Sequence, residues 1–502
     1  MTIVRFPARK SIAIGHTQQV RKRVMEATGN TRQKIIMVFF ALVGATIVSA
    51  VWGTLLAQSA LLGLMGISAV GYFFVIFLRP FFATLLFLFA LPLGPLLNLP
   101  FTQGGFLLSL VVVQTGFAVW VIRALFVRDE SLSVLPLTKP VHLLMLAFVS
   151  AMGLSLLNTP EMTASLNQIK RFTYYVIIYF FIVYTVKDVR RFKWSIFVLL
   201  AGYFVAALLG LVEGIAGKGI YEFLGHRSLL GGPLPPPVLD INPGKLNGPA
   251  GNAEFHSFRM ITFFACLLAL LVVWRSGMKK AAIVGVILVA LINIIGTSYR
   301  GAVLGLLVSG ATFCLAGRLR RKWLIVTASV LLILSIGWSV YMIFPQLDVE
   351  RLTKTSGHAV ETVAFRKNNI IIGLEMAADH PIIGNGPDGF LLNYHRYRSI
   401  LPQAHVRAVK VHNTYVQVLA EYGIIGLSIF GLIIVLTLRN VFSALKRLEG
   451  WDHFMVVSLF SALLAHVAMM IGGNILLDDN WWTLVALGGV VDRIYARPVS
   501  DA

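Results

Sequence analysis

Residues 279–301 read KKAAIVGVILVALINIIGTSYRG: two lysines are followed by an uncharged, almost wholly apolar run that ends at Arg300. A helix of about 20 such residues crosses the hydrocarbon core of a bilayer. Similar runs recur along the 502-residue chain, which is 57% hydrophobic and only 13% charged. The sequence therefore predicts an all-α, polytopic integral membrane protein and excludes an ordinary soluble globular chain.

Fourteen runs are long and apolar enough to be predicted as membrane spans, and twelve is the lower alternative. We place them at residues 35–56, 58–78, 81–97, 105–126, 141–158, 173–186, 194–214, 258–274, 281–297, 300–317, 323–344, 412–438, 453–472 and 481–492. The third, sixth and last of these runs are short or interrupted by proline, which also fits re-entrant segments.

These spans divide the chain into seven predicted parts. They are an N-terminal tail (1–34), N-terminal spans (35–214), a first long outer loop (215–257), central spans (258–344), a large, partly helical outer loop (345–411), C-terminal spans (412–494) and a short C-terminal tail (495–502).

Charge indicates the orientation of these parts. The chain carries 43 Lys and Arg against 22 Asp and Glu, a formal net charge of +21. In a soluble protein this excess would favour nucleic acid as a partner, but here most of the basic residues stand in tails and short links between apolar runs. Lys and Arg are retained there on the cytoplasmic side. We therefore expect both termini to be cytoplasmic, the membrane lipids to be partners, and no nucleic acid.

The two long outer loops are where we expect external chemistry. The first is rich in Pro and Gly, which favours irregular backbone. In the second, Ile370, Ile371, Leu374 and Ala377 recur near helical spacing. This spacing predicts an amphipathic helix that lies on the membrane surface and stops before Pro381.

Arg300 follows one apolar run and begins the next, so its guanidinium is expected at the outer membrane surface. A charge placed there is a functional candidate because its desolvation is costly. Guanidinium offers a rigid fork of donors that suits diphosphate oxygens. The alternative is an interfacial arginine that reaches lipid headgroups.

A glycine-rich turn follows the predicted surface helix. Asp379 to Phe390 read DHPIIGNGPDGF, and Gly384 and Gly386 permit close approach of backbone to a ligand. Any tight turn would look similar, and no nucleotide-binding pattern follows it.

His412 stands where the second outer loop re-enters the membrane, in the stretch HNTYVQVLAEYGIIG of residues 412–426. Imidazole has an unperturbed pKa of about 6.5 and can act as a general base near neutral pH. A structural histidine is the alternative. Glu421 shares a helix face with Gln417, and its offset points it away from His412, so we predict a packing or hydrogen-bonding role for it.

Metal-independent chemistry is expected, because no zinc, nucleotide or serine-hydrolase motif is present. Asp478 and Asp479 are adjacent in a short outer link, and we expect them to be solvated rather than to bind metal.

At these clusters the sequence resembles the O-antigen ligase and O-antigen polymerase superfamily over roughly residues 245–435. The matching positions are His412, Asn413, Tyr415, Leu419, Glu421, Gly423 and Gly426; Arg366 with Pro381, Gly384, Gly386 and Phe390; Ser298, Tyr299, Arg300 and Gly301, where Tyr299 departs from the family's Ser-Arg-Gly; and, more loosely, Gly248 to His256.

The resemblance implies a GT-C-like membrane glycosyltransferase in the bacterial inner membrane, with its site facing the periplasm. The donor would be a glycan on undecaprenyl diphosphate, and the acceptor a glycan or lipid A core sugar. His412 would take the acceptor proton, Arg300 and Arg366 would stabilise the leaving diphosphate, and the anomeric carbon would be inverted. Asn413, Tyr299, Gly384, Gly386 and Arg259 are candidate substrate-binding residues, and His256 is a weaker one. No cofactor or metal is expected.

Several functions remain open from the sequence. The motifs do not separate a polymerase from a ligase, although chain length, span number and the basic tail favour an exopolysaccharide or O-antigen polymerase. A protein O-glycosylating enzyme is a third possibility. A transporter or flippase would share the hydropathy, but it would place polar groups at the midplane and often show internal repeats. A structural assembly subunit would not need Arg300 and His412 together, and partner proteins of polysaccharide assembly stay undetermined.

Overall fold

A computed structural model of the chain describes residues 75–97, 108–126, 139–225, 229, 245–317, 358–400 and 410–495. The predicted spans 35–56 and 323–344, most of 58–78, the N-terminal tail and most of the C-terminal tail lie outside these residues. So do residues 226–228 and 230–244 of the first long loop and residues 345–357 and 401–409 of the second. The chain divides into two compact units, and residues 81–114 and 136–502 form the larger one. In the smaller unit, the described part of α4 places Phe117 and Trp120 in ring contact at 5.5 Å.

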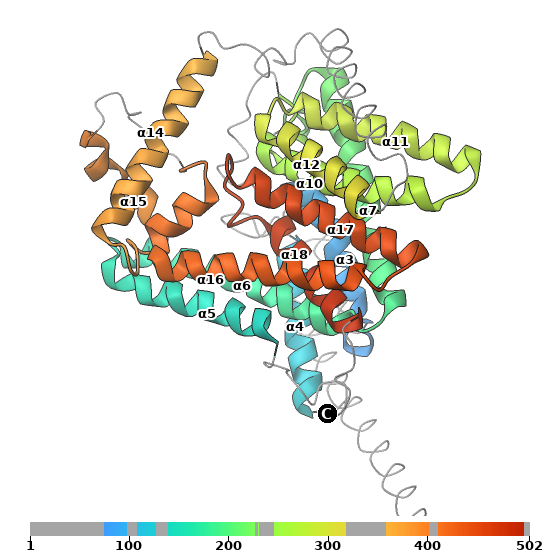
Figure 1. Cartoon of the computed structure of the whole chain (residues 1–502), viewed down its shortest axis with the longest axis horizontal. Helices are drawn as coiled ribbons and strands as arrows, with labels where there is room; N and C mark the ends of the chain where they lie inside the picture. The colour runs from blue at the N-terminus through green and yellow to red at the C-terminus, as the bar shows by residue number, and fades with distance from the viewer. Residues whose placement is uncertain are drawn as a thin grey trace, which may run out of the picture. The chain divides into compact units, whose positions relative to one another are not determined.

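Every secondary-structure element of the described residues is helical (Figure 1). The α-helices are α3 (Phe81–Ala90), α4 (Leu108–Phe126), α5 (Pro140–Ser155), α6 (Met162–Thr185), α7 (Val189–Ala216), α8 (Ile220–Phe223), α10 (Ala253–Val273), α11 (Gly277–Gly296), α12 (Arg300–Ala316), α14 (His358–Asp379), α15 (Gly389–Tyr397), α16 (Thr414–Leu445), α17 (Gly450–Met469) and α18 (Asp479–Tyr495). Short 3-10 turns are η1 (Leu91–Leu97), η3 (Leu156–Asn158), η4 (Gly248–Ala250) and η6 (Arg398–Ile400).

The helical membrane fold predicted from the sequence is confirmed. Six described helices are long and apolar enough to cross a membrane: Pro140–Asn158, Val189–Ala216, Ala253–Val273, Gly277–Gly296, Thr414–Leu445 and Gly450–Met469. Phe81–Leu97, Val111–Ile122 and Arg300–Ala316 are shorter apolar helices. The predicted spans 173–186 and 481–492 fall on α6 and α18.

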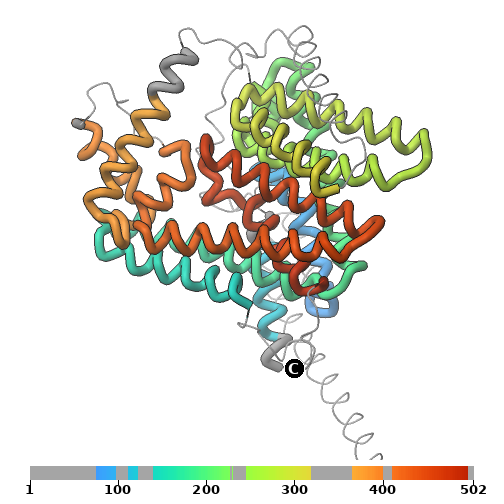
Figure 2. The backbone as a smooth tube through the Cα atoms, viewed as in Figure 1, coloured from blue at the N-terminus to red at the C-terminus, as the bar shows by residue number. Residues whose placement is uncertain are grey.

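Helix α10 is the most enclosed of the six long helices and packs against α7, α11, α12 and α17. Its residues Phe258, Met260 and Ile261 are fully buried. Helix α16 runs along α5 and α18, and α17 turns back beside it (Figure 2). Helices that are apolar on all sides bury some faces against neighbouring helices and leave the other faces for contact with lipid.

The links predicted on the outer side of the membrane contact one another. The Asn158 side chain at the end of α5 donates to the Gly384 carbonyl at 2.8 Å, and Leu246 N–H donates to the Gly296 carbonyl at 2.8 Å. These bonds join links that are 226 and 50 residues apart in the sequence. The charge pattern of the sequence assigns these links to the same side of the membrane. In the fold the same links are in contact.

The links predicted on the inner side pair in the same way. Lys139 forms an ion pair with Asp492 at 2.9 Å, and Lys193 forms one with Asp452 at 2.7 Å. Both pairs join the start of one helix to a residue distant in the sequence, so Lys139 and Lys193 have acidic partners within the fold.

Helix α14 differs from its prediction in the face that it buries. A helix is present and ends at Asp379, before Pro381, as expected. Ile372 and Met376, however, are fully buried against α15 and α16, whereas Leu374 is 46% exposed. The sequence spacing could not reveal α15, which supplies Phe390, Tyr394 and Tyr397 to this cluster and shifts the buried face by one position.

Candidate active site

A short loop between α17 and α18, residues 470–474, is the hub of the candidate site, and we call it the Gly472 loop. Its carbonyls accept hydrogen bonds from three residues at the starts of two helices, α12 and α16. Tyr299 Oη donates to Gly472 O at 2.9 Å, Asn413 Nδ2 to Ile471 O at 3.1 Å, and Thr414 Oγ1 to Gly473 O at 2.7 Å. The loop thereby fixes the end of α11, the start of α12 and the start of α16 around one point.

Glu254, at the start of α10, is held by the same loop. Its Oε1 accepts a hydrogen bond from Asn474 N–H at 2.9 Å. A Cβ added to Gly473 would lie 2.5 Å from Tyr299 Oη and 2.6 Å from Glu254 Oε1. The absence of a side chain at Gly473 therefore lets the tyrosine and the glutamate approach the loop together.

His412 faces Glu254. Its Nδ1 lies 3.9 Å from Glu254 Oε2, and its ring lies 6.2 Å from the Phe365 ring. The backbone of His412 is left-handed, with φ 56°, a conformation that few residues with a side chain adopt outside functional or turn positions. Only 21% of the side chain is exposed.

Burial, together with the positive charges of Arg366 and Lys410, lowers the pKa of His412 to about 4. The imidazole is therefore neutral at pH 7, as a proton acceptor must be. Because His412 Nδ1 lies 3.9 Å from Glu254 Oε2, the two side chains are too far apart for a direct hydrogen bond.

Asn413, a predicted substrate-binding residue, caps helix α16. Its Oδ1 accepts from Val416 N–H at 3.0 Å, while its Nδ2 donates to the Gly472 loop. Asn is a preferred residue at this position because its oxygen satisfies a free helix N–H. The asparagine thereby fixes the position of His412, its neighbour in the sequence.

Arg366 and Tyr299 lie together on the other side of the Gly472 loop. The Arg366 guanidinium carbon is 5.9 Å from the centre of the Tyr299 ring, a cation–π arrangement. The neighbour of Arg366 in the chain, Phe365, contacts His412, as described above. The structure thus brings together three residues that the sequence proposed separately: Tyr299, Arg366 and His412.

Arg300 is the first residue of α12 and is exposed. It follows Tyr299 directly, so it lies at the border of the same site. It stands at the start of a helix, and its place at the outer membrane surface stays a prediction.

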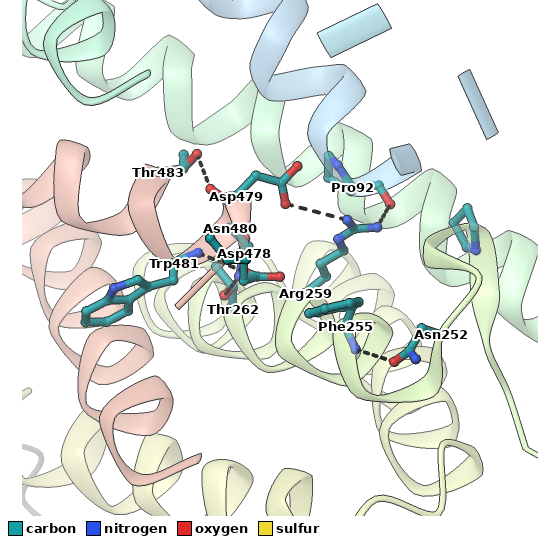
Figure 3. Close-up of polar contacts among 12 residues, drawn as sticks. Pro92, Asn252, Phe255, Arg259, Thr262, Asp478, Asp479, Asn480, Trp481 and Thr483 are labelled. Atoms are coloured by element: carbon teal, nitrogen blue, oxygen red, sulfur yellow. Dashed lines mark hydrogen bonds and ion pairs between the residues drawn. The ribbon is translucent and has the colours of Figure 1, made fainter. Parts of the chain in front are cut away.

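Arg259, by contrast, belongs to a buried polar cluster (Figure 3). Its Nη1 donates to Pro92 O at 3.1 Å, and its Nη2 lies 3.7 Å from Asp479 Oδ1. The residue is only 5% exposed. Contacts of this kind give Arg259 a part in holding η1, α10 and α18 together.

Asp478 and Asp479 are not solvated, contrary to the sequence prediction. Asp478 is 2% exposed and accepts a hydrogen bond from Trp481 N–H at 2.9 Å (Figure 3). Burial and the neighbouring Asp479 raise the pKa of Asp478. The sequence could not indicate this, because the arginine that compensates the pair lies about 220 residues earlier in the chain.

His256 also lies in the interior. It is fully buried, with Nε2 at 2.9 Å from Asn293 Oδ1, and Asn293 in turn donates to Ala207 O on α7. These contacts join α10, α11 and α7, so His256 has a structural role in this fold.

Gly384 and Gly386 approach protein backbone rather than an open cavity. Their φ values are +74° and +90°, and a Cβ on Gly384 would lie 2.4 Å from the backbone of Glu421. Gly386 N–H donates to Glu421 O at 3.1 Å, and Gly384 N–H donates to His380 O at 2.9 Å. Because both N–H groups are donated within the protein, the glycines serve to dock the turn on α16.

Helix α16 is interrupted where the turn docks. Gly423 has φ 63° and ψ −164°, so the regular helix stops and restarts there. The N–H of Ile424 donates to Pro381 O at 2.8 Å, which satisfies a group that the interruption frees. Glu421, fully buried just before it, accepts from Gln417 at 3.3 Å, as the sequence spacing predicted.

Sequence reasoning missed Glu254, Lys410 and the Gly472 loop. Glu254 is a single carboxylate at a helix start, and Lys410 stands two residues before His412 among other basic residues of the outer loop. The two consecutive glycines of the Gly472 loop were the available signal, since they mark a close approach of backbone. No group of three or more His, Cys, Asp or Glu side chains suited to a metal ion occurs among the described residues.

A helical membrane protein with a polar site where several helix ends meet is the class that this fold and site define. Residues 285–431 of the chain match the family model described as O-Antigen ligase. The predicted resemblance to the O-antigen ligase and polymerase superfamily is thereby confirmed over a stretch that contains Tyr299, Arg300, Arg366 and His412. Glu254 and Arg259 precede it. No curated protein matches the chain.

Proposed function

We propose that this protein is a glycosyltransferase that moves a glycan from undecaprenyl diphosphate to a sugar hydroxyl at the periplasmic face of the bacterial inner membrane. The observation that carries the proposal is the meeting of His412, Glu254 and Arg366 around the Gly472 loop, in a chain with an O-antigen ligase domain. A proton acceptor beside a cation is what attack by a hydroxyl on a diphosphate-activated sugar requires.

In the proposed reaction, the acceptor oxygen attacks the anomeric carbon of the donor sugar from the face opposite the diphosphate. A carbon–oxygen bond to the acceptor forms, the bond to the diphosphate oxygen breaks, and the configuration inverts. His412 accepts the hydroxyl proton, and the carboxylate of Glu254 stabilises the imidazolium that results. Undecaprenyl diphosphate leaves with the electron pair.

Arg366 is assigned to the negative charge that develops on the leaving diphosphate. The Tyr299 ring lies against one side of the Arg366 guanidinium and holds it in place. The N–H donors of the guanidinium are thereby oriented before the diphosphate binds. Arg300 is assigned to the diphosphate as it enters from the membrane surface, since it is exposed at the start of α12. These charges would take the place that a divalent cation has in many nucleotide-sugar enzymes.

The acceptor decides between two versions of this activity. Polymerisation of exopolysaccharide or O-antigen repeat units uses a second lipid-linked repeat as acceptor, whereas ligation uses lipid A core. We favour polymerisation, on the sequence features named above. Both versions place the termini in the cytoplasm and the Gly472 loop outside.

The test is a transfer assay with purified protein in nanodiscs and undecaprenyl diphosphate-linked repeat units, with and without lipid A core. We expect longer glycan from the donor alone and a loss of about 10²- to 10⁴-fold in His412→Ala, the usual contribution of general base catalysis. Arg366→Ala should lower turnover as well. His395→Ala and Arg396→Ala, exposed on α15, are matched controls that should retain activity.

Each outcome of this assay has a definite reading. Transfer only when core is present would make the protein a ligase. Normal turnover of His412→Ala would refute the general-base assignment. Lipid translocation without glycan transfer would show that the protein is a transporter and not a glycosyltransferase.

A further inference from the structure

A cavity of about 120 Å³ lies beside His412, lined from α6, α15, α16, the Gly472 loop and the segment before His412. At about 30 Å³ of liquid volume per molecule, this space corresponds to about four water molecules, so it holds part of a polar ligand, such as the hydroxyl-bearing edge of a sugar ring. Asn474 lines the cavity, and its backbone N–H donates to Glu254, which faces His412. The cavity therefore adjoins the proposed proton acceptor.

Three amide side chains of the wall have unused hydrogen-bonding groups, and in Gln168 the unused group is Nε2. Asn474 is only 6% exposed, and neither its Nδ2 nor its Oδ1 has a partner among the residues described. Gln417 is 8% exposed. Its Nε2 donates to Glu421, but its Oε1 has no hydrogen-bond partner among the residues that the structure describes. Buried polar groups of this kind cost free energy unless a ligand or water satisfies them.

The unused amide groups comprise two donors and two acceptors. A sugar hydroxyl both donates and accepts, so a polyhydroxylated ring satisfies such a mixed set. The wall also carries two cations, Arg171 and Lys410, and two carboxylic acids, Asp388 and Glu421. The wall therefore mixes basic and acidic groups and is not the purely cationic surface that a diphosphate selects. Phe390 supplies an aromatic surface for the apolar face of a sugar ring.

We propose that this cavity binds the sugar residue of the acceptor glycan that carries the attacking hydroxyl, with Asn474 and Gln417 as the side chains that recognise it. This inference rests on the proposed glycosyltransferase function for the identity of the glycan as acceptor. Asn474 and Glu254 connect the wall of the cavity to His412. We assign the attacking hydroxyl to the end of the sugar nearest the imidazole. Arg366 and Arg300 are left for the donor diphosphate.

The test measures binding apart from turnover. The probe is the free oligosaccharide repeat, released by mild acid from the lipid-linked repeat of the organism that encodes the chain. Its Kd for full-length protein in nanodiscs is measured by ligand-observed NMR for wild type, His412→Ala, Asn474→Ala and the control Asn393→Ala. Asn393 lies on α15, where its side chain bonds only to the Gly389 carbonyl one turn earlier.

We expect Asn474→Ala to weaken binding about fivefold or more, as the loss of two hydrogen bonds implies. Asn393→Ala should bind like wild type. The melting temperature of Asn474→Ala should not fall, because truncation of a buried side chain without partners leaves no other group unsatisfied. A lowered melting temperature that accounts for weaker binding would assign Asn474 a structural role and overturn the inference.

Two other results would also overturn it. One is equal affinity of wild type and Asn474→Ala, or no binding by wild type. The other is displacement of the oligosaccharide by inorganic pyrophosphate, with pyrophosphate binding lost in Asn474→Ala, which would assign the cavity to the donor. Glycan binding without transfer would support the cavity assignment and refute the proposed function. Transfer and binding that do not depend on Asn474 would support the proposed function and refute the cavity assignment.

Discussion

At the scale of single residues, the protonation of His412 follows from its neighbours. Burial excludes water from the imidazole, and Arg366 and Lys410 add positive charge near it, so that its pKa is about 4. Each of these effects disfavours the imidazolium. A substrate diphosphate would add negative charge beside the arginine and would raise the pKa of His412 toward that of a more effective base.

This argument predicts the pH dependence of transfer. The base works when neutral, so kcat/KM should fall only as the pH drops toward about 4, and should be flat from about pH 5 to pH 8. The acid limb of kcat, which reports the enzyme with donor bound, should lie at higher pH. Initial rates across this range check both limbs. An acid limb of kcat/KM near pH 6.5, the unperturbed value, would contradict the role of burial.

Substitution of Arg366 by Gln gives a matched comparison for the same prediction. Loss of the positive charge should raise the pKa of His412 and shift the acid limb of kcat/KM to higher pH. Arg396→Gln on the exposed surface should leave it in place.

The candidate site could be predicted from the sequence to the extent that its residues sit in local motifs. His412, Arg366 and Tyr299 stand in such motifs, and the fold brings them together. Glu254 escaped prediction because its partners, Asn474 and His412, are 220 and 158 residues away. Arg259 was assigned to substrate for the same reason: its buried partner Asp479 could not be paired with it before the fold was known.

At the scale of elements, the decisive feature is the interruption of α16. The turn that contains Gly384 and Gly386 fits against the freed backbone of α16, so the interruption positions the outer loop next to His412. The helices themselves were predictable, because a run of apolar residues suffices to identify a span. The interruption was not, because Gly423 lies within an apolar run that is otherwise ordinary.

Gly423→Ala tests this feature. A Cβ there would lie 2.3 Å from Ile382 O, and φ 63° with ψ −164° is a region that only glycine adopts readily. We expect a loss of about 1–3 kcal/mol in stability, measured by thermal unfolding in nanodiscs. Gly431→Ala on the same helix is the control, since an added Cβ meets nothing within 4 Å there. Equal melting temperatures for the two variants would show that the interruption is not required.

At the scale of the whole larger unit, the helix links sort into two sets. The set with Asn158, Gly384 and Gly472 builds the site, and the set with Lys139 and Asp492 is joined by ion pairs. The charge asymmetry of the sequence predicted this sorting, since a miscounted span would have placed contacting links on opposite sides. It could not predict which links of one side touch, because that depends on side-chain packing between helices.

The sorting gives a prediction about sidedness that is independent of catalysis. Lys218, after α7, belongs to the site side, and Lys279, at the start of α11, belongs to the opposite side; both are exposed. In a background with Cys266→Ser and Cys314→Ser, a membrane-impermeant maleimide should label Lys218→Cys in intact spheroplasts. It should label Lys279→Cys only after permeabilisation, because positively charged links are retained in the cytoplasm. Labelling of Lys279→Cys alone in intact cells would invert the orientation and place His412 in the cytoplasm, where a periplasmic transfer reaction could not occur.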